Sequence, residues 1–152
     1  MRKKIYVAAL FLLYVCIGFF REFIFLNINE QSRVTYYHDN DSHVSSSMQW
    51  LSRFSYSTLH YAKWPLTFLF TCIFAYLSAL IIRIFFADRE KVKLTWIIFA
   101  MTFLAGALFY FIGALLGHSY ATYDIARFLA GLTETPALLI ILFASFLLMK
   151  KK

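Results

Sequence analysis

Four charged side chains interrupt long apolar runs, and their types and positions make them the chain's best candidates for chemistry. Arg21 and Glu22 come late in the first run, and Arg127 and Glu134 come around the start of the last. An ionisable group inside a bilayer is costly unless it is paired or hydrated. We therefore expect these groups to pair. The cluster then either holds helices together or forms a polar pocket that binds a partner or a lipid headgroup.

The spacing along the chain predicts that these groups meet at one depth. Counted from the basic residues at the two chain ends, Arg21 and Glu134 both lie about 25 Å outward at about 1.5 Å per helical residue. Arg127 lies two helical turns before Glu134 on nearly the same face. Tyr110 reaches the same depth and is predicted to donate a hydrogen bond to the cluster.

The elements that must position these residues are membrane helices. The 152-residue chain is 61% hydrophobic and 20% aromatic, with a mean hydropathy of +0.66, and a spanning helix needs roughly 20 apolar residues. We predict an all-α integral membrane protein, a single domain with four transmembrane helices at about 5–28, 65–87, 94–116 and 133–149. The first run follows basic residues as a signal peptide does, but its length and the lack of a cleavage site favour a retained helix.

Basic residues predict the orientation, because Lys and Arg in short flanking segments resist translocation. With the amino terminus inside, ten basic residues fall on the cytoplasmic side: Arg2, Lys3, Lys4, Arg83, Arg89, Lys91, Lys93, Lys150, Lys151 and Lys152. The outer side receives only Arg33, Arg53, Lys63 and Arg127, with Arg21 near the boundary. Both termini are therefore predicted to be cytoplasmic. The net charge of +7 is a topology signal with an affinity for anionic lipid, and nucleic acid is not an expected partner.

The predicted outer loop, residues 29–64, is the longest segment outside lipid. Its second half has apolar residues at steps of three or four from Ser45 onward, which predicts an outer amphipathic helix before Pro65. Aromatic residues such as Trp50 and Trp64 are of the kind that settle at a headgroup boundary. This helix lies either flat on the outer leaflet or as a lid on the bundle.

Small residues predict where helices approach closely in lipid. The candidates are Ala75 and Ala79 in the second run and Gly106, Gly113 and Gly117 in the third. Whether this seam lies within one chain or makes a homodimer stays open. Cys16 and Cys72 are predicted to be packing residues, since the chain has no Cys-x-x-Cys redox pair.

Enzyme and metal chemistry have little support in the sequence. The residues His38, Asp39, Asp41, His43, His60 and His118 are of metal-binding types, but their spacing matches no established ligand motif. No serine lies in a recognised nucleophile turn. We expect no enzymatic activity, no cofactor and no bound metal.

The layout resembles one known family. A charged, aromatic exit from the first span (Arg21-Glu22-Phe23-Ile24-Phe25), two middle spans and a last helix that opens Ala126-Arg127-Phe128-Leu129 before Pro136 resemble the small exosortase F-associated membrane proteins of Bacteroidota. This chain has Leu26-Asn27-Ile28-Asn29 where the family has an acidic Tyr-Asp-Pro type sequence, and its proline follows later. The resemblance implies an accessory role beside an envelope-sorting system, and no functional residue carries over.

The sequence favours two possible functions. The first is a non-enzymatic accessory or subunit of a cell-envelope complex in a bacterial inner membrane, with the bilayer and a membrane protein complex as partners. The second is a small dimeric proton-coupled transporter that uses a membrane carboxylate, Glu134 or Glu22.

Overall fold

The computed structural model describes residues 2–38, 41–117 and 119–150, and all regular structure within them is helical. The elements in chain order are α1 (Arg2–Tyr37), the 3₁₀ helix η1 (Ser46–Arg53), α2 (Tyr56–Phe86), α3 (Arg89–Leu116), α4 (Ser119–Thr133) and α5 (Pro136–Lys150). Three helices, α1 to α3, are long and apolar enough to cross a membrane. A fourth crossing is added if α4 and α5, bent by 64° at their junction, form one span.

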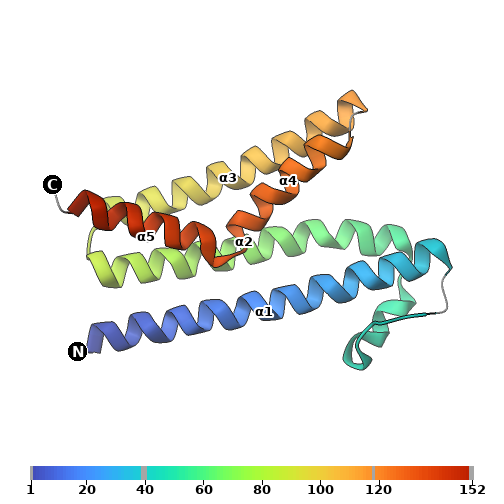
Figure 1. Ribbon diagram of the computed structural model, residues 1–152, viewed down its shortest axis with the longest axis horizontal. Helices are drawn as coiled ribbons and strands as arrows, with labels where there is room; N and C mark the ends of the chain where they lie inside the picture. The colour runs from blue at the N-terminus through green and yellow to red at the C-terminus, as the bar shows by residue number, and fades with distance from the viewer. Residues whose placement is uncertain (1, 39–40, 118, 151–152) are drawn as a thin grey trace.

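The helices form an elongated bundle in which α1 and α2 run side by side (Figure 1). The start of α1, the end of α5 and the turn between α2 and α3 lie at one end of the molecule, and η1 lies at the other. The helices α3 and α4 pack along each other and diverge from α1 and α2 toward the η1 end. The α3–α4 pair therefore splays away from the α1–α2 pair at the η1 end.

The core of the bundle is built around α2. Its buried side chains pack with those of α1, α3 and α5 in one aromatic and aliphatic cluster: Tyr14, Phe70, Phe74, Ala75, Leu77, Ile81, Ile82, Phe99, Leu138, Leu139, Leu142 and Phe146. The rings of Tyr14 and Phe74 lie 4.6 Å apart. Because lipid tails are as apolar as these side chains, close van der Waals packing, and not removal from water, stabilises this core in a membrane.

The turn between α2 and α3 ends one helix and starts the next within two residues. Ala87 adopts a left-handed conformation, with φ of 53°, and its N–H donates to the Arg83 carbonyl. Asp88 caps α3 by accepting a hydrogen bond from the Glu90 N–H at 3.0 Å. The hydrogen bond from Lys91 to Asp88 holds the pKa of that carboxyl below its usual value. The cap explains why α3 begins before the apolar run predicted at 94–116.

The predicted outer loop, 29–64, is wrong in its first part, because α1 continues through Asn29 to Tyr37. No glycine or proline interrupts this stretch, and Ser32 and Thr35 donate to the carbonyls of Ile28 and Gln31 on the preceding turn. Polarity marked these residues as lying outside lipid, but polarity alone does not end a helix.

The predicted amphipathic helix before Pro65 divides into two elements. The 3₁₀ helix η1 packs Leu51 against Ile28 and Leu59. Then α2 begins at Tyr56, where the Ser55 hydroxyl caps the Thr58 N–H at 3.3 Å, and continues through Pro65. A proline inside a helix removes one hydrogen bond, and here that loss does not end the helix.

The small residues of α2 and α3 have different roles. Ala75 and Ala79 are buried, and Gly106 lies against α4, where an added Cβ would be 3.4 Å from the Ala126 carbonyl oxygen. At Gly113 an added Cβ would overlap the Thr122 side chain. Gly117 instead caps α3 in a left-handed conformation, with open space around it. Within this chain Gly117 therefore makes no helix contact, and the α3–α4 seam uses Gly106 and Gly113, which are seven residues apart.

Candidate functional site

The break between α4 and α5 carries a buried carboxylate that pairs with α1. The Glu134 side chain is fully buried, and its Oε2 forms an ion pair with Nη2 of Arg21. The Nη1 of the same guanidinium lies 2.9 Å from Glu22 Oε2, and its plane lies over the Phe25 ring, 4.4 Å from the centroid. The structure thus brings together three of the predicted cluster residues, Arg21, Glu22 and Glu134.

Side chains of α1 and α2 satisfy the polar groups exposed by the break. Tyr14, buried in α1, donates its hydroxyl proton to the Thr135 carbonyl at 3.1 Å. The hydroxyls of Thr71 and Thr133 lie 3.2 Å apart. Pro136 begins α5, where its missing N–H costs nothing because a first-turn N–H has no partner in the helix. Hydrogen bonds from two neighbouring helices, α1 and α2, therefore stabilise the break.

One oxygen of the buried carboxylate remains weakly satisfied. Glu134 Oε1 makes no hydrogen bond of regular geometry within the described residues, although the Thr67 side chain lies beside it. A buried carboxylate with a single strong partner depends heavily on that partner. Without the counter-charge of Arg21, the buried carboxylate of Glu134 would therefore destabilise the fold.

Arg127 and Tyr110 are not part of this cluster, which corrects the sequence prediction. The prediction treated Arg127 and Glu134 as two positions on one continuous helix face, but the helix ends at Thr133 and the chain bends by 64°. Tyr110 packs its ring edge-on against Trp64, with centroids 4.3 Å apart. Both residues line a separate pocket.

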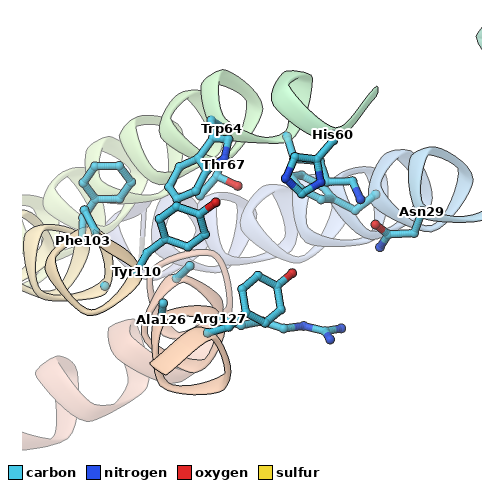
Figure 2. A pocket seen from close by; sticks show the side chains of 14 residues that line it. Asn29, His60, Trp64, Thr67, Phe103, Tyr110, Ala126 and Arg127 are labelled. Atoms are coloured by element: carbon cyan, nitrogen blue, oxygen red, sulfur yellow. The ribbon is translucent and has the colours of Figure 1, made fainter. Parts of the chain in front are cut away.

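That pocket has a cavity volume of about 270 Å³ and lies between four helices near the η1 end. Its lining comes from α1, α2, α3 and α4: Phe25, Asn29, His60, Lys63, Trp64, Thr67, Phe103, Gly106, Ala107, Tyr110, Tyr123, Ala126, Arg127 and Ala130. Figure 2 shows Asn29, His60 and Arg127 toward one end of the pocket and Phe103, Trp64 and Tyr110 toward the other. The pocket has a polar mouth and an aromatic interior.

The pocket and the ion pair are neighbours. Phe25 lines the pocket and carries the Arg21 guanidinium on its ring, and Thr67 lines the pocket and lies beside Glu134. Sequence patterns did not predict Thr67, Asn29 or Lys63 as pocket residues. The sequence predicts Lys63 only as one of the outer basic residues. The signal that places it at the pocket is the spacing of His60, Lys63, Trp64 and Thr67, which lie on one face of α2 at i, i+3, i+4 and i+7.

Other candidate residues are not gathered into a site. Among the residues that the structure describes, no group of three or more His, Cys, Asp or Glu side chains is placed to hold a metal ion. Asp39 and His118 lie outside the described residues. Cys16 and Cys72 are both exposed on the bundle surface, so their predicted packing role is wrong.

Comparisons with protein-family models, with curated proteins and with solved structures find no match for this chain. The resemblance to exosortase F-associated membrane proteins therefore stays a prediction. Within the described residues, three helices, or four if α4 and α5 form one bent span, are long and apolar enough to cross a membrane, which is consistent with a multi-pass integral membrane protein.

Proposed function

We propose that this protein is a non-enzymatic, four-span subunit or accessory of a cell-envelope complex in a bacterial inner membrane. In this proposal α4 and α5 together make the fourth span, and both termini and the α2–α3 turn face the cytoplasm. Two observations support this orientation. The start of α1 and the end of α5 lie at the same end of the bundle as the α2–α3 turn (Figure 1). Most of the basic residues belong to these three segments of the sequence.

A single observation carries the partner-binding part of the proposal: a carboxylate on the outward face of α1. The Glu22 side chain is 56% exposed, and it contacts the guanidinium of the preceding residue, Arg21, whose side chain is 19% exposed. Phe19 and Leu26 share this face of the helix and are also exposed. By residue count Glu22 lies about 27 Å from the cytoplasmic boundary, still within a hydrocarbon core of about 30 Å.

A half-exposed carboxylate at that depth is unfavourable against lipid and favourable against a polar partner. Arg21 cannot fully neutralise Glu22, because the same guanidinium pairs with Glu134. Two acids, Glu22 of α1 and Glu134 of the α4–α5 break, share one base, so the cluster has an excess negative charge, and Glu22 is its exposed acid. A partner helix that carries a cation or a hydrogen-bond donor would complement this charge, whereas an all-apolar partner would not.

Affinity purification from native membranes tests this proposal. We expect the tagged protein, extracted in mild detergent, to co-purify with a different membrane protein at fixed stoichiometry. We expect Glu22→Gln to reduce that yield at least tenfold, because a hydrogen bond to a charged group is worth about 1.5–3 kcal/mol. Glu90→Gln, which removes an exposed carboxylate at the start of α3, is the matched control and should leave the yield unchanged.

The alternative function, a proton-coupled transporter, gains support from one observation. Glu134 lies where a helix is broken, and broken helices commonly form the substrate and ion sites of transporters. If the protein purifies only as a homodimer, and if reconstituted vesicles take up protons through wild-type protein but not through Glu134→Gln, the accessory proposal is wrong and the transporter is favoured.

A further inference from the structure

The pocket between α1, α2, α3 and α4 carries cations without an acid partner. Lys63 and Arg127 line it from α2 and α4, and neither forms an ion pair within the described residues. They are close enough for Arg127 to repel Lys63 electrostatically. Asp124 shares a shallow neighbouring hollow with Arg127, but none of the ion pairs among the described residues joins the two. The mouth of the pocket therefore attracts an anion.

The mouth also lies at the depth of lipid headgroups. Lys63 and Arg83 both lie on the continuous helix α2, 20 residues apart, which is about 30 Å of helix. That distance equals the thickness of the hydrocarbon core, about 30 Å. With Arg83 at the inner boundary, Lys63 therefore lies at the outer boundary, where phosphate groups are found.

The inner part of the pocket suits an amphiphile and not a free ion. Beyond the cations, its walls are the rings of Trp64, Tyr110 and Phe103 and the small residues Gly106 and Ala107. The cavity of about 270 Å³ is smaller than the roughly 300–1,000 Å³ of sites that enclose a whole drug-sized ligand. It has room for a headgroup and its glycerol linkage, while longer chains would remain in the bilayer.

We propose that this pocket binds the phosphate headgroup of an anionic lipid from the outer leaflet. Lys63 and Arg127 contact the phosphate, His60 and Asn29 border it at the mouth, and the aromatic wall covers the glycerol region. The assignment to the outer leaflet rests on the orientation proposed above, whereas the binding itself uses the pocket and not the Glu22 face of α1.

Fluorescence of Trp64 reports this binding directly. Trp50 and Trp96 do not line the pocket and are replaced by Phe, so that Trp64, which lines it, is the only tryptophan. The protein in neutral detergent micelles is titrated with dioctanoyl phosphatidic acid, dioctanoyl phosphatidylcholine and inorganic phosphate. We expect a saturable change in emission with phosphatidic acid only.

Variants identify the groups responsible. We expect Lys63→Gln and Arg127→Gln each to weaken binding of phosphatidic acid at least tenfold, and Lys63→Arg to retain binding. Arg53 is an exposed cation outside the pocket, so the control variant Arg53→Gln should bind within twofold of wild type. Circular dichroism checks the helix content of each variant, and if one glutamine variant loses helix the other decides. Equal binding of phosphatidylcholine, or wild-type affinity in the glutamine variants, overturns the proposal. Inorganic phosphate binding as tightly as the lipid would make this a free-anion site and would also overturn it.

Discussion

Arg21→Gln is expected to lower the free energy of unfolding by about 3–5 kcal/mol, because it leaves the buried Glu134 carboxylate without its counter-charge. The carboxylate has no second strong donor to replace the guanidinium, and it lies where two helix segments meet α1. The loss should also loosen the break between α4 and α5. Titration with SDS in mixed micelles, followed by circular dichroism of the helices, measures the effect.

Two comparisons make the Arg21 result specific. Glu22→Gln removes the exposed member of the same cluster and should cost less than about 1 kcal/mol, as exposed pairs do. The exchange Arg21→Glu with Glu134→Arg should recover part of the stability that each single reversal loses. If Arg21→Gln unfolds at the wild-type SDS concentration, the ion pair does not hold the helices together.

Gly113→Ala is expected to destabilise the protein by about 1–3 kcal/mol, the usual cost of overpacking a close contact. The new Cβ would overlap both the hydroxyl and the Cβ of Thr122, and a Cβ cannot move without its helix. The substitution should therefore push α4 away from α3 at the η1 end. The same SDS titration measures the change.

Gly131→Ala is the matched control for this substitution, because an added Cβ at Gly131 meets nothing within 4 Å. It should be neutral or stabilising, since alanine favours a helix over glycine by about 1 kcal/mol. The double variant Gly113→Ala with Thr122→Gly should be less destabilised than the two single changes added together. Strict additivity would show that the two residues do not touch.

The sequence was sufficient to predict the helical membrane class and part of the cluster. Runs of about 20 apolar residues have few other stable forms, and counting residues from basic anchors placed Arg21 and Glu134 at one depth. That count works because the rise of a helix is constant. It failed for Arg127, because the break at Thr133 changes both direction and face, and a break depends on tertiary partners such as the Tyr14 hydroxyl.

Sequence patterns could not predict the pocket, because it too depends on how the helices pack. Its lining residues come from four helices, and no short spacing links Asn29, Lys63, Tyr110 and Arg127. The helix ends in the outer region were also misplaced. The polar residues from Asn29 to Tyr37 predict a loop, but in the structure Ser32 donates a hydrogen bond within the helix and Glu30 pairs with Arg33 one turn later.

The arrangement separates two roles that are adjacent in sequence. Arg21 turns inward to the broken helix, where its loss should affect folding, while Glu22 remains half exposed, where its loss should affect partner binding. This separation is what distinguishes a subunit surface from a purely structural cluster. A variant at Glu22 that folds normally but no longer forms the complex would demonstrate this separation.

Photo-crosslinking in native membranes tests the partner surface most directly. A p-benzoylphenylalanine at position 19, beside Glu22 on α1 and 74% exposed, is compared with one at position 104 on α3, where Leu104 is 60% exposed. We expect an adduct with one defined protein partner from position 19, none from position 104, and loss of the adduct with Glu22→Gln. Lipid adducts alone at position 19, or the same protein adducts from both positions, would contradict this expectation.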